Sequence, residues 1–145
     1  MTTLPCLQPI TSAAEAFAAI ALAAVACDGE LAGAEARRLR QQLEFRQPFC
    51  DASEAEMAAL LDRLLLALRE QGCQGLVEQA VALLPLEHRD SAFAVAADLT
   101  AADHVETGDE RRFLQQLADQ LEIPADRRAQ ILEVIALLNC DSLAG

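Results

Sequence analysis

Residues 19–41 read AIALAAVACDGELAGAEARRLRQ, and residues 94–116 read AVAADLTAADHVETGDERRFLQQ. When the first stretch is laid on the second without a gap, the same residue types recur at matching positions. The identical pairs are Ala19 with Ala94, Ala21 with Ala96, Ala26 with Ala101, Asp28 with Asp103, Gly33 with Gly108, Glu35 with Glu110, Arg37 with Arg112, Leu39 with Leu114, and Gln41 with Gln116. The chain therefore carries one helix-loop-helix segment twice, and we expect the two copies to form pseudo-symmetric halves.

The composition favours helices throughout. Hydrophobic residues, mainly Ala and Leu, make up 53% of the chain, whereas Tyr and Trp are absent. Alanine has the highest helix propensity, and the β-branched residues that favour strands are few. A chain of 145 residues suits one domain that buries a core without disulfides or a structural metal. The sequence predicts a single all-α domain over residues 1–145, with repeat units of about 13–45 and 91–121.

Hydrophobic periodicity, capping residues and prolines divide the chain into about seven expected helices. Their expected ranges are Ser12–Cys27, Gly33–Phe45, Ser53–Gln71, Gln74–Leu84, Pro85–Ala102, Thr107–Leu121 and Pro124–Asn139. Short connections between amphipathic helices predict antiparallel neighbours, so we expect a compact bundle.

Two serines are expected to cap helices, and several hydrophobic stripes are expected to face the core. Ser12 precedes Glu15 by three residues, and Ser53 precedes Glu56 by the same spacing, which is typical of a capping box. The clearest stripe is Met57, Leu60, Leu61, Leu64, Leu65 and Leu68. The stripe expected in the last helix is Ile131, Val134, Ile135 and Leu138.

The charge balance excludes several classes of function. The 23 acidic residues outnumber 11 basic ones, all of them Arg, and the formal net charge is −12. This charge repels nucleic-acid phosphates and anionic lipid headgroups, so we expect neither as a partner. We expect no membrane span either, because the apolar stretch Ala13–Cys27 contains Glu15. Without lysine, Schiff-base chemistry and a phosphate-binding P-loop are excluded. Because no nucleophile elbow, dinucleotide loop or histidine-rich metal motif is recognisable, we do not expect an enzyme.

The cysteines predict neither a disulfide framework nor a zinc site. They are odd in number and widely spaced, at Cys6, Cys27, Cys50, Cys73 and Cys140. The apolar stretch Ala13–Cys27 contains Glu15 and lacks a basic leader, so we interpret it as a core helix and expect a cytoplasmic protein. A nucleophilic Cys27–His104 pair is an alternative to simple core packing of a small cysteine.

The repeated acids suggest a cation site. Asp28 and Asp103 end expected helices, where the negative end of the helix dipole disfavours an acid by about 0.3–1 kcal/mol. Glu35 and Glu110 follow at the same spacing in the two copies. Carboxylates and helix-end carbonyls are the hard oxygen ligands that Ca²⁺ and Mg²⁺ prefer. The sequence predicts a divalent cation site made by Asp28, Glu35, Asp103 and Glu110.

The same acids also have a structural interpretation. Asp28 before Gly29 is a common turn element, and Glu110 follows Thr107 at capping-box spacing. Glu35 lacks that explanation, because Ala32 at the equivalent cap position has no hydroxyl. Two interpretations therefore stay open: a cation site, or a metal-free protein–protein interaction module whose repeated acids serve as capping and turn residues.

The motif Ala26-Cys27-Asp28-Gly29-Glu30 followed by Glu35, in an alanine-rich helix pair that recurs later, resembles the tellurite-resistance TerB family. The resemblance covers residues 13–45 and 91–138, with the characteristic acids at Asp28, Glu35, Asp103 and Glu110. It implies a compact, non-enzymatic helical scaffold that binds a metal or a protein partner in the response to tellurite or related stress. The chain departs from the motif at His104, where the first copy has glycine.

Overall fold

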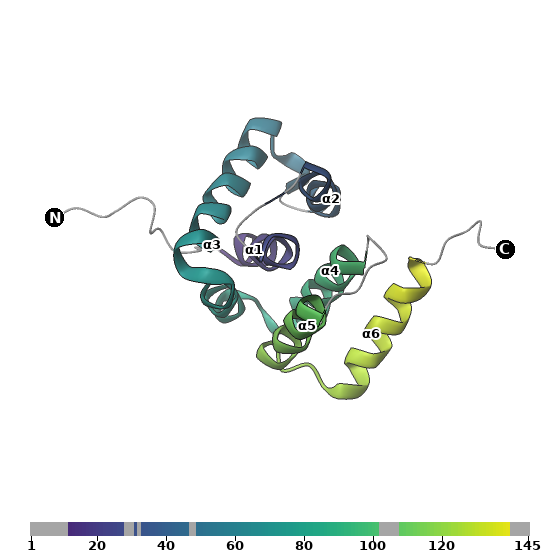
Figure 1. The fold of residues 1–145 in the computed structure, drawn as a ribbon. Coiled ribbons are helices and arrows are strands. Elements are labelled where there is room, and N and C mark those ends of the chain that lie inside the picture. The colour runs from purple at the N-terminus through teal and green to yellow at the C-terminus, as the bar shows by residue number, and fades with distance from the viewer. Residues whose placement is uncertain (1–11, 28–30, 32, 47–48, 102–107, 140–145) are drawn as a thin grey trace.

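The computed structural model describes residues 12–27, 31, 33–46, 49–101 and 108–139, and all regular structure there is helical (Figure 1). The α-helices are α1 (Ala13–Ala26), α2 (Gly33–Glu44), α3 (Glu54–Leu83), α4 (Arg89–Ala101), α5 (Gly108–Gln120) and α6 (Ala125–Leu138). The short 3₁₀ helices are η2 (Phe49–Asp51) and η3 (Leu86–His88). The predicted all-α class is confirmed. Within these described ranges, no helix is both long and apolar enough to cross a membrane.

The expected third and fourth helices form one bent element, α3, so the described residues contain six α-helices rather than about seven. The bend lies at Gly72, whose backbone has φ 81° and ψ 162°. This region of backbone space is open almost only to glycine. The sequence therefore located the break correctly, although the chain continues into the next helical turn without a loop.

Helix α1 lies in the middle of the bundle, where α2, α3, α4 and α5 contact it (Figure 1). Alanines around its circumference are buried together with Ile20 and Leu22. A helix that is apolar on all sides is typical of an enclosed position rather than a surface one. Phe17 and Ala24 are half-buried, whereas Leu22 is fully buried.

Both predicted serine caps are present. The Ser12 hydroxyl accepts a hydrogen bond from the backbone N–H of Glu15 at 3.1 Å. Ser53 and Glu56 form a complete capping box, with bonds of 3.1 and 2.8 Å between each side chain and the other residue's N–H. The Glu15 carboxylate forms an ion pair with Arg63, which ties the start of α1 to α3.

Asp98 joins three helices through one carboxylate. It is half-buried in α4 and accepts hydrogen bonds from the side-chain amides of Gln42 in α2 and Asn139 at the end of α6. The Asn139 amide also donates to the carbonyl oxygen of Ile135 at 3.0 Å. The position of α6 therefore depends on a polar contact as well as on apolar packing.

Arg46 holds the end of α2 against α1. Its guanidinium carbon lies 5.3 Å from the centroid of the Phe17 ring and 4.6 Å from that of Phe45. Its Nε donates to the Gln42 carbonyl at 2.8 Å. Burial against these groups lowers the pKa of the guanidinium, which nonetheless stays protonated at neutral pH because its ordinary value is so high.

Helix α6 is less buried than its sequence predicts. Of the expected stripe, Ile135 is buried and Ile131 half-buried, but Val134 is 53% exposed and Leu138 is 72% exposed. Helix α6 packs chiefly against α4, at one side of the bundle (Figure 1). A single neighbouring helix covers a narrower face than the sequence stripe provides, so the prediction for Val134 and Leu138 was wrong.

A Gly72→Ala substitution tests the bend in α3. A Cβ atom at Gly72 would meet no atom within 4 Å, so strain at positive φ is the expected cause of any loss. We expect the free energy of unfolding to fall by about 1–3 kcal/mol in urea denaturation. Gly33→Ala is the control, since its Cβ also meets open space, and it should change stability by less than about 0.5 kcal/mol. Equal stability of the two variants would show that the bend needs no glycine.

An Asp98→Ala substitution tests the three-helix junction. Losing an acceptor for two amide groups should lower the free energy of unfolding by about 1.5–3 kcal/mol, measured by chemical denaturation. Asp90→Ala provides the comparison, because it removes a partly exposed ion pair with Arg127 and should cost under about 1 kcal/mol. If Asp98→Ala is no more damaging than Asp90→Ala, the junction contributes little to the fold.

Candidate functional site

Two of the four predicted cation ligands are in the part of the chain that the structure describes. Glu35 lies in the first turn of α2, and Glu110 occupies the corresponding position of α5. Asp28 and Asp103 are outside the described residues, each two positions beyond the last residue of the preceding helix, α1 or α4. Each glutamate thus opens the helix that follows the loop carrying its matched aspartate.

Glu35 and Glu110 line the same surface hollow, although they lie far apart in the sequence. Its volume is about 550 Å³, and we call it the shared hollow. Its walls come from the end of α1, the start of α2, the part of α3 beyond the bend, and α5. Both glutamates also line a smaller adjoining hollow of about 190 Å³, which Leu99 of α4 reaches. The fold therefore brings together the two glutamates of the repeated motif.

The shared hollow is not uniformly acidic. Arg112 contributes to its wall, and Arg38 lines the smaller adjoining hollow with both glutamates. Glu35, Glu110 and Arg38 are half-buried, so their charges are only partly screened by water. The charge around the two glutamates is therefore mixed, and the guanidinium groups reduce the attraction for a cation.

A complete metal site is not formed by the described residues alone. Among them, no group of three or more His, Cys, Asp or Glu side chains is placed to hold a metal ion. Ca²⁺ takes six to eight oxygen ligands, and two carboxylates supply too few of them. Further ligands would have to come from loop residues such as Asp28 and Asp103, from backbone carbonyls and from water.

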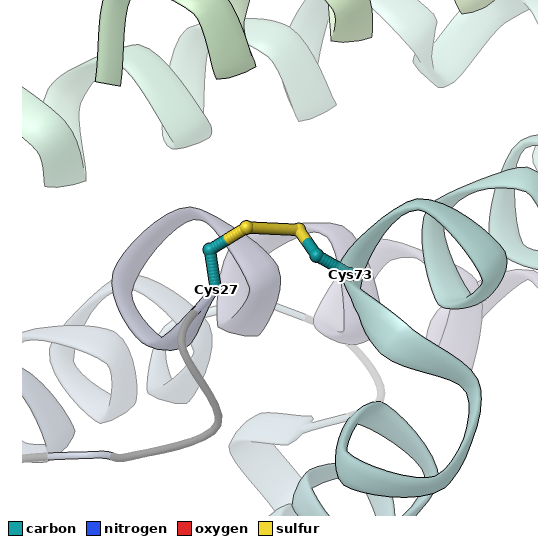
Figure 2. The surroundings of a disulfide bond; sticks show 2 residues. All are labelled: Cys27 and Cys73. Carbon is teal, nitrogen blue, oxygen red and sulfur yellow. A yellow bond between two sulfur atoms is a disulfide. The ribbon is translucent and has the colours of Figure 1, made fainter. Parts of the chain in front are cut away.

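A disulfide joins Cys27 to Cys73 (Figure 2). Both cysteines line the shared hollow. Cys27 is the C-cap residue of α1, and Cys73 follows Gly72 at the bend of α3. Their Cα atoms are 5.3 Å apart, and the two residues are separated by 46 positions in the chain. The disulfide fixes the end of α1, just before Asp28, against the bend in α3.

The sequence-based expectation of no disulfide was wrong for this pair. The spacing of Cys27 and Cys73 matches no short cysteine motif, and their approach results from the packing of α1 on α3. The alternative of a catalytic Cys27–His104 pair also loses its nucleophile, because the Cys27 sulfur is bonded to Cys73. His104 itself lies outside the described residues.

A second hollow of about 660 Å³ lies between α4, α5 and α6. Its walls are largely apolar, with Phe93, Leu114 and Leu132 among the lining residues. Arg128 at its edge is already paired with Asp119 at 2.8 Å. Of the two repeated acids in the described part of the chain, Glu110 lines this hollow and Glu35 does not, whereas both line the shared hollow, which is therefore the better candidate for the predicted cation site.

Comparison with known proteins gives no relative: no protein-family model, curated protein or solved structure matches this chain. The resemblance to the TerB family therefore rests on the repeated motif alone.

Loss of the disulfide should destabilise the fold measurably. In the chain-entropy description, a crosslink that closes a loop of this length stabilises the folded state by about 4 kcal/mol. We expect a Cys27→Ser/Cys73→Ser double variant to lose about that much free energy of unfolding in urea. Cys50→Ser, which removes an exposed free thiol, is the control and should change it by less than about 0.5 kcal/mol. A double variant as stable as this control would mean that the crosslink adds nothing to the fold.

Proposed function

We propose that this protein is a non-catalytic helical domain of the TerB type that binds a divalent cation, Ca²⁺ or Mg²⁺, between its two helix-loop-helix copies. The observation that carries the proposal is that Glu35 and Glu110, at matching positions of the repeat, line one hollow. In this proposal the two copies are related by a pseudo-two-fold axis, and Asp28 and Asp103 supply loop ligands.

The chemistry around the shared hollow suits a hard cation. Glutamate carboxylates from the starts of two helices provide oxygen ligands, and the loops that precede them follow helix ends whose last carbonyls lack helical partners. Ca²⁺ accepts irregular arrangements of carboxylate, carbonyl and water oxygens, whereas Mg²⁺ requires near-octahedral geometry and keeps more water. A site assembled from two loops therefore favours Ca²⁺ over Mg²⁺.

Charge sets the expected affinity. A formal net charge of −12 raises the concentration of cations near the protein surface. Arg38 and Arg112 act in the opposite direction, because they place positive charge in the walls beside the glutamates. We expect dissociation constants in the range of about 10⁻⁵ to 10⁻³ M. The affinity would therefore be lower than that of a dedicated calcium-buffering protein.

A metal-free interaction module is the second candidate, and the exposed side of α6 favours it. Val134, Leu137 and Leu138, which are spaced along one face of the helix, are 53, 68 and 72% exposed. Contiguous exposed apolar side chains often mark a surface that another protein covers. In this alternative Glu35 and Glu110 act only on the helix starts, where each acid contributes about 0.3–1 kcal/mol of stability.

The proposed role in tellurite or related stress rests on the motif resemblance alone.

Cation titration of the wild-type protein and a Glu35→Gln/Glu110→Gln double variant tests the cation site. We expect Ca²⁺ binding by calorimetry in the wild type and a loss of affinity of at least about tenfold in the variant, because two ligands lose their charge. The control is Glu87→Gln/Glu133→Gln, which makes the same change in net charge at exposed positions of η3 and α6.

The outcome separates the two candidates. If binding is absent at millimolar Ca²⁺, Mg²⁺ and Mn²⁺, the cation proposal fails and the acids are helix-start residues. The proposal also fails if both double variants bind as tightly as the wild type, since the affinity would then come only from the overall charge.

A further inference from the structure

We propose that the Cys27–Cys73 disulfide is a reversible exchange site for small peptide thiols of the glutathione class, and that the Cys27 sulfur is the one they attack. This inference is independent of the cation site, although both involve the shared hollow. It is carried by the placement of the disulfide in the wall of an open hollow and by the unequal exposure of its two cysteines.

The two halves of the disulfide have different surroundings. Cys27 is exposed at the C-cap of α1, whereas Cys73 is half-buried and packs against the hydrophobic core. Access is one of the factors that set the rate of thiol–disulfide exchange. An incoming thiolate therefore reaches the Cys27 sulfur first, and the Cys73 sulfur is the leaving group.

The lining of the shared hollow suits a peptide thiol rather than a purely apolar one. Gln74, Gln116 and Gln120, each with a side-chain amide, line the hollow together with the two cysteines. Each amide can both donate and accept hydrogen bonds, which complements the peptide groups and carboxylates of a short peptide. With about 550 Å³, the hollow is in the size range of small-molecule pockets.

The exchange balances with two equivalents of thiol. The first thiolate forms a bond to the Cys27 sulfur as the Cys27–Cys73 bond breaks, and the Cys73 thiolate takes a proton from water. A second thiolate then attacks the sulfur of the bound peptide thiol and releases the Cys27 thiolate, which is protonated in turn. The protein disulfide is thereby reduced to two thiols, and two small thiols are oxidised to one small disulfide.

The structural consequence is local to the shared hollow. The disulfide joins the last turn of α1 to the segment of α3 beyond Gly72 (Figure 2). Reduction frees these two segments from each other, whereas the buried middle of α1 remains held by α3 and α4. We expect backbone amides near Val25 and Gly72 to exchange hydrogen faster after reduction, while those near Ile20 stay protected.

The test uses the full chain with Cys6, Cys50 and Cys140 replaced by serine, so that only the pair remains. The oxidised protein is incubated with glutathione without denaturant, quenched with acid, alkylated and mapped by mass spectrometry. We expect a glutathione adduct on Cys27 to exceed that on Cys73 by at least about tenfold, because Cys73 is less accessible. Equal adducts, or reduction only when denaturant unfolds the protein, would overturn the proposal.

Two further comparisons do not depend on trapping that intermediate. With oxidised glutathione, a Cys73→Ser variant should form its adduct at Cys27 at least about tenfold faster than a Cys27→Ser variant does at Cys73.

A Gln116→Ala/Gln120→Ala variant should be reduced several-fold more slowly by glutathione. Its rate of reduction by dithiothreitol, which has no peptide groups, should be unchanged. Gln41→Ala/Gln130→Ala, at exposed positions outside the hollow, is the control. If the glutamine variant reacts equally more slowly with both thiols, or is slowed with neither, the glutamines do not recognise the peptide groups of glutathione.

Discussion

The close packing of α1 is the constraint on which the rest of the structure depends. Its alanines carry short side chains, so the neighbouring helices must approach the α1 backbone closely to leave no voids. Ile20 and Leu22 are the larger side chains of α1 that are fully buried in this contact. Because α2, α3, α4 and α5 all pack on α1, the position of each of these helices is set by the same surface.

The shared hollow forms where α1 ends. Helix α1 ends at Ala26, and the hollow lies at this end, between α2, the part of α3 beyond the bend, and α5. Glu35 and Glu110 reach this space from two helix starts, and Cys27 reaches it from the end of α1 itself. The cation proposal uses the two carboxylates, and the exchange proposal uses the disulfide. Both depend on the same geometric fact, which is that the central helix α1 ends at the edge of this hollow.

The two copies of the repeat differ in their surroundings. In the first copy, α1 is enclosed, and its end is crosslinked to α3. In the second copy, α4 packs on α1 and also supports α6, whose outer side stays exposed. A duplicated sequence therefore does not give duplicated environments, because each copy has different neighbours. The disulfide has no counterpart in the second copy for a simpler reason, because Ala102 stands at the position that matches Cys27.

The sequence alone determined the helical class, the serine caps at Ser12 and Ser53, and the break at Gly72. These features depend on neighbours within about one helical turn, through backbone propensity, capping hydrogen bonds and allowed backbone angles. The tertiary structure decided the Cys27–Cys73 pairing, the meeting of Glu35 and Glu110 in one hollow, and the exposure of α6. These depend on which helices pack together over long sequence separations, and periodicity along the chain carries no information about the partner that a helix face will meet.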